Sequence, residues 1–291
     1  MAHADLIWVD GKLADSLPLP DRGLAFGDGL FETILLVDGK PVLVEFHRQR
    51  LAAGARRLNF QSVSEGFDQA LELACDAAAD VHRSRHADTS EARALRITVT
   101  RGEGPRGYAP PAQGKPRIVS QLSSLAPEIL TWQAPARLGV SSIGLSTQPL
   151  LAGIKHLNRL EQVLAATQCR EQGLDEALMC DQQGAVISVV AGNLFVVSDG
   201  CLLTSPLVQC GVAGTRRRAI IERWAPALGL DVQQQQISVQ QCREADELLF
   251  CNSLQGVRGV AQLAGRSWTG NPVARALHGQ YQGELRMRGL P

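Results

Sequence analysis

The chain has 291 residues, 45% of them hydrophobic, and a formal net charge of zero. This length exceeds what one ordinary core organises, so two domains are expected. A neutral chain is not expected to bind nucleic acid or an anionic membrane surface. No run reaches the ~20 apolar residues of a membrane span. The start, MAHADLIWVDG, lacks the basic and apolar regions of a signal peptide.

The cysteines indicate a compartment. There are seven of them, an odd number, and no Cys-x-x-Cys pair occurs. Several border apolar runs, where a free thiol packs as a small hydrophobic group. This pattern favours a reducing, cytoplasmic location and argues against a disulfide framework or a zinc site. We therefore predict no metal.

In the first half, the hydrophobic pattern predicts an antiparallel meander with helices. Asp10-Gly11 and Asp38-Gly39 are hairpin turn signals. A segment with two prolines, residues 123–135, is the expected linker, which gives domains 1–122 and 136–291. The expected strands are 6–9, 33–37, 42–44, 95–100 and 118–122, the expected helices are 46–58 and 67–81, and 82–92 is expected to be a loop.

The second half contains a lysine directly before a helical pattern. Leu157, Leu160 and Leu164 recur at helical spacing after Lys155. The amine of Lys155 is therefore predicted to lie near the positive end of a helix dipole, which favours the neutral, nucleophilic form. The alternative is an ordinary exposed lysine. The other expected elements are strands 137–145, 176–180, 185–190, 194–197 and 248–251, a helix that opens from the turn at 211–218 and runs to 224, and a final strand and helix.

The run LAGIKHLNRLEQVL, residues 151–164, resembles the cofactor-lysine segment of the aminodeoxychorismate lyases. These are pyridoxal-phosphate enzymes of fold type IV, together with the D-amino-acid and branched-chain aminotransferases. The resemblance extends along most of the chain. It implies a two-domain α+β fold like that of D-amino-acid aminotransferase, a homodimer, and pyridoxal 5′-phosphate held by Lys155. The implied reaction converts a small molecule, 4-amino-4-deoxychorismate, to 4-aminobenzoate and pyruvate, with Lys155 as general base.

Other segments resemble the cofactor-binding residues of the family. The pattern His47-x-x-Arg50-Leu51 resembles its phosphate-binding motif, and a planar guanidinium can donate two parallel hydrogen bonds to a phosphate. The turn before residue 218 matches the family's phosphate loop, where free N–H groups at a helix start suit an anion. From the residues alone, an exposed helix arginine and a plain turn remain open. The further cofactor contacts that the resemblance implies are Val212 against the ring face, Gly214, Thr215, Arg216, Asn252 and Ser253.

Substrate contacts are implied in the first half and beside the lysine. The loop RGEGPRGY is followed by two prolines, so no helix opens there as a phosphate cradle requires. It resembles the RG-x-G-x-RGY loop of the lyases, which implies that Arg101, Arg106 and Tyr108 face an anionic substrate. Thr33 aligns with a family threonine near the substrate, and Asn158 is a candidate for the pocket of Lys155. Loop arginines without a role, a strand-start threonine and a helix-cap asparagine are the alternatives.

One position departs from the family pattern. Family members carry a glutamate five residues before the asparagine of an Asn-Leu-Phe strand, where it keeps the pyridine nitrogen protonated. Here that position is Ser188, before Asn193. A hydroxyl supplies no negative charge, so the ring is expected to be a weaker electron sink. This favours elimination, which can expel its leaving group soon after proton removal. The alternatives are a D-amino-acid or branched-chain aminotransferase, a slow or altered enzyme, and a non-catalytic pyridoxal-phosphate-binding protein.

Overall fold

The computed structural model describes residues 5–60, 63–85 and 90–287. These divide into two compact units. The first unit contains residues 5–129 and the short segment 154–158, and the second unit contains residues 130–153 and 159–287. The segment that carries Lys155 therefore belongs to the first unit, although the residues on both sides of it belong to the second.

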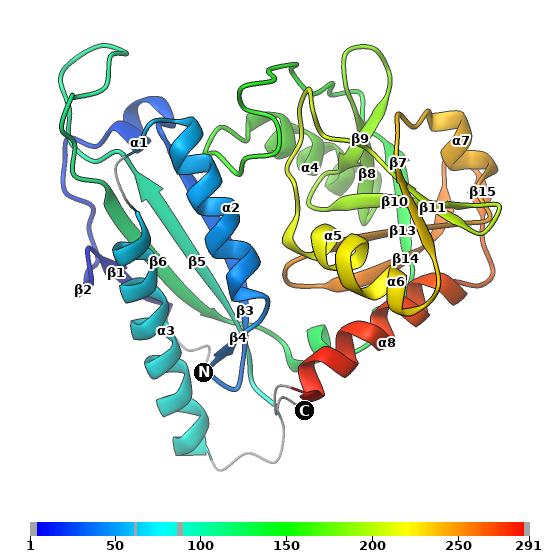
Figure 1. Ribbon diagram of the computed structural model, residues 1–291, viewed down its shortest axis with the longest axis horizontal. Helices are drawn as coiled ribbons and strands as arrows, with labels where there is room; N and C mark the ends of the chain where they lie inside the picture. The colour runs from blue at the N-terminus through cyan, green and yellow to red at the C-terminus, as the bar shows by residue number, and fades with distance from the viewer. Residues whose placement is uncertain (1–4, 61–62, 86–89, 288–291) are drawn as a thin grey trace. The chain divides into compact units, whose positions relative to one another are not determined.

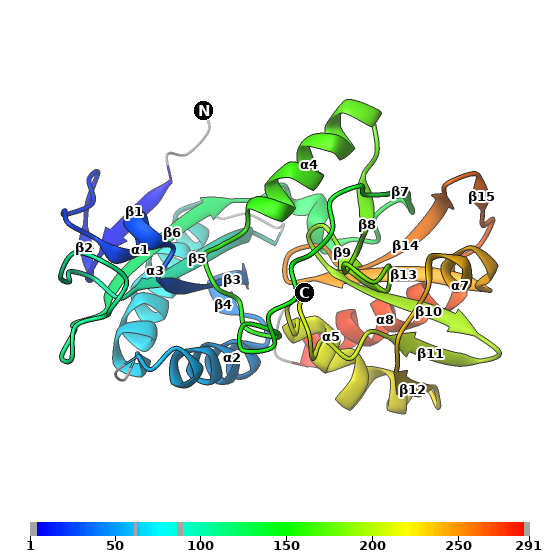
Figure 2. The same ribbon diagram turned by 90° about the horizontal axis from the view of Figure 1, so that it is seen from above.

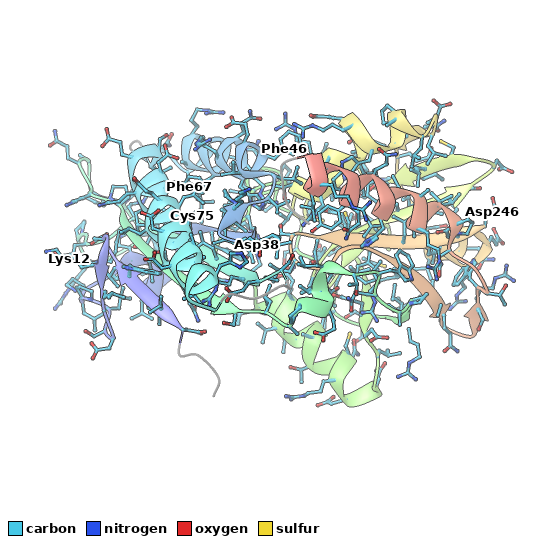
Figure 3. All side chains as sticks on the ribbon, turned by 90° about the horizontal axis from the view of Figure 1, so that it is seen from below. Lys12, Asp38, Phe46, Phe67, Cys75 and Asp246 are labelled. Atoms are coloured by element: carbon cyan, nitrogen blue, oxygen red, sulfur yellow. The ribbon has the colours of Figure 1, made fainter. Side chains whose placement is uncertain are left out.

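The first unit is an antiparallel sheet with helices on one face. Its six strands follow the order β2-β1-β6-β5-β3-β4. Helices α2 and α3 lie on the same face of this sheet (Figures 1 and 2), and Phe67 and Cys75 lie along α3 (Figure 3). The elements are β1 (Leu6–Val9), β2 (Lys12–Leu13), α1 (Arg22–Phe26), β3 (Gly29–Val37), β4 (Lys40–Pro41), α2 (Val44–Arg57), α3 (Ser64–Arg85), β5 (Ala92–Thr100) and β6 (Arg117–Ser124).

The turn residues explain the meander. Asp10 and Gly11 have φ values of 49° and 79°, and Asp38 and Gly39 have 49° and 76°. Two successive positive φ values match the twist of a two-residue hairpin, so both predicted turns are confirmed. The strand expected at 42–44 was wrong, because Leu43 also has positive φ and α2 begins at Val44. The loop expected at 82–92 was partly wrong, because α3 continues to Arg85; residues 86–89 lie outside the described ranges.

The second unit is built on a nine-stranded mixed sheet. The strand order is β12-β11-β10-β13-β14-β7-β8-β9, and β15 pairs with β14. Figure 2 shows α4 on one side of this sheet and α5 and α8 on the other. The strands are β7 (Ala136–Val140), β8 (Glu176–Cys180), β9 (Val186–Val189), β10 (Asn193–Ser198), β11 (Cys201–Thr204), β12 (Asp231–Gln234), β13 (Glu247–Asn252), β14 (Gly256–Leu263) and β15 (Arg266–Ser267).

The helices of the second unit differ from the expectation mainly at their ends. Between Thr215 and Ala227 the chain is helical throughout, with a π-helical stretch at Ile220–Trp224. The strand expected at 137–145 stops at Val140. The helices are α4 (Leu160–Gln172), α5 (Thr215–Ala219), α6 (Ala225–Ala227), α7 (Val239–Glu244) and α8 (Pro272–Met287); a 3-10 turn, Pro127–Leu130, lies in the range expected as a linker.

The hydrophobic core of the second unit explains why its strands form. Leu178, Leu194, Val196 and Phe250, from three strands, share one buried cluster. The fold is thus α+β, as predicted. Among the described helices, none has both the length and the apolar content needed to cross a membrane.

Candidate active site

Backbone pairing with β3 holds Lys155. The Phe31 N–H donates to the Lys155 carbonyl at 2.9 Å, and the Leu157 N–H donates to the Gly29 carbonyl at 3.1 Å. Between them, Leu30 and His156 form an antiparallel bridge. The Lys155 Nζ lies 4.3 Å from the centroid of the Phe31 ring. The backbone of the lysine is thus fixed to the start of β3, on the edge that β4 does not cover.

The expected helix dipole does not explain this lysine. Helix α4 begins at Leu160, five residues after Lys155, with Arg159 as its N-cap. A helix dipole acts mainly within its first turn, and Lys155 precedes that turn by five residues, so the prediction of a helix directly after Lys155 was wrong. The apolar spacing marked an outer face, because Leu160 and Leu164 are exposed and the helix buries Ala165 instead.

Two glycines make room for the lysine segment. Gly27 has φ +65°, and a Cβ there would lie 2.5 Å from Asn158 Oδ1. A Cβ on Gly29 would lie 2.7 Å from Leu157 Cδ1. Both approaches are closer than real Cβ contacts allow, so glycine is required. Asn158 Nδ2 donates to the Gly27 carbonyl at 3.2 Å, which gives Asn158 a tethering role next to Lys155.

The face of β3 that carries Phe31 also carries Thr33, because side chains alternate along a strand. Thr33 pairs with Arg96 of β5, and the Arg96 guanidinium lies 4.0 Å from the centroid of the Phe31 ring. Arg96 makes no hydrogen bond or ion pair to any residue that the structure describes. Sequence reasoning missed Arg96. The strand ARALRITVT contains two cations, Arg93 and Arg96. The signal was the second one, which interrupts an apolar alternation.

Arg50 belongs to a buried charge cluster on the opposite face of β3. Its Nε and Nη2 donate to the Glu32 carboxylate at 2.8 and 2.5 Å, and Glu32 is also 2.6 Å from His47 Nδ1. Burial alone would raise the pKa of Glu32, but the charges of Arg50 and His47 and their hydrogen bonds lower it to about 2. Sequence reasoning found Arg50 and missed the carboxylate that orients it.

Arg101 is tied into the scaffold of the first unit. Its guanidinium donates to Asp28 Oδ2 at 2.8 Å and to the carbonyls of Leu58 and Asn59 at 2.8 and 3.2 Å. It also lies 4.0 Å from the centroid of the Phe60 ring. These contacts use all three of its nitrogens, so they support a structural role in place of the substrate contact predicted from the sequence.

Arg22, in helix α1, holds the loop that carries Arg106 and Tyr108. It donates to the carbonyls of Gly107 and Tyr108 at 2.9 and 2.7 Å, and to Asp28 at 3.0 Å. Tyr108 is 88% exposed. Arg106 is also exposed, and its side chain makes no hydrogen bond or ion pair within the described chain. The loop backbone is therefore fixed while both of its predicted substrate-facing side chains stay accessible.

In the second unit, Asn193 holds the turn that contains Val212 and Gly214. Its Nδ2 donates to the Val212 carbonyl at 2.9 Å, and the Gly214 N–H donates to its Oδ1 at 3.1 Å. A Cβ on Gly214 would collide with that Oδ1, so the close approach requires glycine. Gly153 pairs with Val212 in a parallel bridge, and Lys155 follows Gly153 by two residues along the chain.

Arg216 and its neighbours join two turns that were predicted separately. The Arg216 guanidinium donates to the carbonyls of Asn252 and Ser253 at 3.1 and 2.8 Å. The hydroxyls of Thr215 and Ser253 lie 3.4 Å apart. The structure therefore brings the predicted residues of both turns together. It directs the Arg216 side chain to backbone carbonyls, whereas the sequence prediction had it contact the cofactor.

Ser188 lies in β9, opposite Met179 of β8, and is 9% exposed. Its hydroxyl makes no hydrogen bond to the described residues. The nearby carboxyl group in β8 is Glu176, which strand alternation from Met179 places on the other face of the sheet. Burial raises the pKa of Glu176 to about 7, although hydrogen bonds from the Ala191 and Val190 N–H groups partly offset the rise. Glu176 therefore does not take the place of the family glutamate.

The antiparallel sheet with its paired lysine segment, and the mixed sheet with its glycine-containing turn, define a fold-type IV architecture. The chain belongs to the class IV amino-transferase family, whose model matches residues 29–263. It is 33% identical to the aminodeoxychorismate lyase of Vibrio harveyi, over 89% of this chain and 92% of that protein.

Solved structures agree on the fold. The crystal structure of 4-amino-4-deoxychorismate lyase from Pseudomonas aeruginosa is similar with a TM-score of 0.83 and 39% identity, over 96% of this chain and 99% of that chain. A pyridoxal-phosphate-bound hypothetical aminotransferase from Mycobacterium tuberculosis is similar with a TM-score of 0.79 and 22% identity, over 96% and 98% of the two chains. The predicted fold type and the resemblance to the lyases are thereby confirmed.

Proposed function

We propose that this protein is a pyridoxal-phosphate-dependent lyase that converts 4-amino-4-deoxychorismate to 4-aminobenzoate and pyruvate. The observation that carries the proposal is the position of Lys155, whose backbone is held by pairing with β3 and whose amine lies over the Phe31 ring. The similarity to two proteins named as this lyase, at 33% and 39% identity over most of the chain, supports the substrate.

The side chains and turns present fit pyridoxal phosphate. Arg216 has a buried Nη1 that lacks a partner within the described chain, which suits an anionic group nearby. The Thr215 and Ser253 hydroxyls and the N–H groups after Gly214 are donors for a phosphate. Arg50 would add a charged contact, and the hydroxyl of Ser188 would accompany the ring nitrogen.

Lys155 would hold the cofactor covalently and, once released by the substrate amine, would act as the general base. Its amine takes the proton from the ring carbon that bears the substrate's amino group. The enolpyruvyl C–O bond then breaks, the ring becomes aromatic, and the enolpyruvate takes up a proton to give pyruvate. The bound cofactor supplies an electron-withdrawing ring that stabilises the charge left by proton removal.

The substrate carries two carboxylates, so two cations are needed to orient it. Arg96 lies on the face of β3 and β5 that also carries Phe31 and Thr33, and it has no carboxylate partner in the described chain. Arg106 is exposed on a loop whose backbone is fixed. We assign these two arginines to the carboxylates and Thr33 to a hydrogen bond with the reacting part of the substrate.

The test is pyruvate release from 4-amino-4-deoxychorismate by the holoenzyme, with Lys155→Ala as control. The variant lacks the amine that forms an imine with the cofactor, so it should release no pyruvate and lose the imine absorption band. Transfer of an amino group to a keto acid, with no pyruvate release, would favour an aminotransferase. Visible absorption without either reaction would favour a binding protein.

We also propose a homodimer in the cytoplasm. Leu160, Val163 and Leu164 are 77%, 56% and 56% exposed on one face of α4, and an apolar helix face of this kind favours burial against a second copy. Light scattering should give twice the chain mass, and Leu164→Glu should reduce it. Leu13→Glu, at a residue 68% exposed in the first unit, is the control. Seven free thiols support a reducing compartment.

A further inference from the structure

Arg216 is a deeply buried cation that lacks a carboxylate partner within the described chain. It is 2% exposed, and its guanidinium lies 4.0 Å from the centroid of the Tyr281 ring. It donates to the Asn252 and Ser253 carbonyls, and its Nη2 is 3.3 Å from the Tyr281 hydroxyl. Over the ranges that the structure describes, no aspartate or glutamate comes within ion-pair distance of it. The hydrogen-bond partners of its charged guanidinium within the described chain are two carbonyls and one hydroxyl, all of them neutral.

The next residue has the same character. Arg217 is 7% exposed, and it donates to the Ser205 carbonyl and to Gln234 Oε1, both at 2.8 Å. Burial lowers the pKa of Arg217. It too lacks an ion-pair partner in the described part of the protein. Burying two adjacent cations without a carboxylate lowers the stability of the folded protein, unless an anion from outside the chain compensates their charge.

The hydrogen bonds of Arg216 also fix the direction of a peptide group. A peptide unit is planar and trans, so its N–H points opposite to its C=O. Because the Asn252 carbonyl faces Arg216, the Ser253 N–H points away from the guanidinium. That N–H has no acceptor among the described residues. Thr215 contacts Ser253 through its hydroxyl, so the free donor lies next to the turn that Gly214 begins.

We propose that Arg216 is a positioning residue for an anion bound by the two turns at 212–215 and 252–253. It orients the Ser253 N–H toward that anion, and the anion in turn compensates the buried charge. Tyr281 of α8 completes the arrangement by covering the guanidinium. The identity of the anion, the phosphate group of pyridoxal phosphate, rests on the proposed function. The proposal that Arg216 positions the binding of a phosphate does not depend on the proposed function.

The test uses the apoprotein and inorganic phosphate as the probe. Thermal unfolding is measured in potassium phosphate and in potassium chloride at equal ionic strength. Phosphate should raise the melting temperature by a few degrees in the wild type, because a ligand that binds only the folded state stabilises it. Arg216→Gln should lose this increment, and its dissociation constant for pyridoxal phosphate should rise about tenfold to a hundredfold. A purely structural role would lower the melting temperature in both salts and keep the increment.

Arg218→Gln is the matched control. Arg218 lies two residues further along, is only partly buried and pairs with Glu222 at 2.7 Å. The same charge change there should leave the phosphate increment intact. If Arg216→Gln does not fold, Arg216→Lys keeps the charge but cannot hold both carbonyls. It should weaken cofactor binding about tenfold.

A full phosphate increment in a folded Arg216 variant, or an equal loss in Arg218→Gln, would overturn the assignment. Pyruvate release is scored separately. A wild type that shows the phosphate increment but no pyruvate release contradicts the lyase proposal alone.

Discussion

The carboxylate of Glu32 holds the guanidinium of Arg50 by two nitrogens inside the first unit, at 2.8 and 2.5 Å. Glu32 is 1% exposed, so the pair is shielded from water. A planar guanidinium that is held by two of its nitrogens keeps one orientation. The orientation of Arg50 is therefore set before any ligand arrives, which suits a residue that must meet a phosphate.

Replacement of Arg50 by alanine is expected to weaken cofactor retention more than it slows the cofactor-saturated enzyme. A charged hydrogen-bonded contact contributes about 1.5–3 kcal/mol, or roughly tenfold to a hundredfold in affinity. The measurement is absorbance titration of the apoprotein with pyridoxal phosphate. Arg56→Ala, at an exposed position of the same helix, is the control. Unchanged affinity in Arg50→Ala would place the phosphate elsewhere.

The two loop arginines are expected to respond differently. Arg101→Ala removes three hydrogen bonds and leaves a partly buried Asp28 less well compensated, so it should lower the free energy of unfolding by about 2–4 kcal/mol. Arg106→Ala should leave the stability unchanged, because the exposed side chain makes no hydrogen bond or ion pair within the described chain. If Arg106 binds a substrate carboxylate, its loss should raise KM about tenfold. Denaturant titration and steady-state kinetics separate the two effects. The reverse pattern would refute a structural role for Arg101 and a substrate-binding role for Arg106.

Ser188→Glu is expected to add slow half-transamination with amino acids. A carboxylate beside the ring nitrogen keeps it protonated and strengthens the electron sink, so the carbanion lives long enough to be protonated on the cofactor. Conversion to the pyridoxamine form is followed by absorbance. Ser188→Gln matches the new side chain in size and carries no charge, so it controls for crowding at this nearly buried position. Equal rates in the two variants and the parent would show that Ser188 does not set the reaction type.

Glu176 is expected to make stability fall as pH rises from about 4.5 to about 7. Its folded pKa of about 7 exceeds the ordinary 4.5, so in this range the folded state keeps a proton that the unfolded state has lost. Above about pH 7 Glu176 is ionised in both the folded and the unfolded state, so its effect on stability no longer changes with pH. Glu176→Gln should therefore match the wild type near pH 4.5 and exceed it by about 3 kcal/mol at pH 8. Denaturant midpoints at the two pH values give the comparison, and a constant difference would contradict it.

Local signals predicted the elements that depend on local chemistry. Strand Glu176–Cys180 was predicted from a short run closed by the turn signal Gln183-Gly184, and the hairpin turn from the pair Asp10-Gly11. Both were confirmed. Strand Asp231–Gln234 was missed because its residues are polar, and only pairing with β11 forms it. The position of Lys155 depends on its hydrogen bond with Phe31 and on the bridge between Leu30 and His156, and both partners in β3 are remote in sequence. The helix expected directly after Lys155 begins only at Leu160.

In the candidate site, too, some residues could be found from the sequence and others depend on contacts between remote segments. Resemblance supplied Arg50, Arg216 and the turn residues, whereas Glu32 and Asn193 act by orienting other groups. Glu32 is 18 residues from Arg50, and Asn193 is 19 residues from Val212. No sequence pattern connects such pairs, because their partnership exists only after the strands have paired.

The pairing of residues 154–158 with β3 has a consequence for the order in which the chain is made. When the ribosome has completed residues 1–129, the backbone of Gly29 to Phe31 still lacks the partner that it has in the native sheet. An exposed strand edge is a template for pairing with other chains. A fragment that ends at residue 129 would expose this edge and favour aggregation, and the first unit becomes complete only when Asn158 has been synthesised.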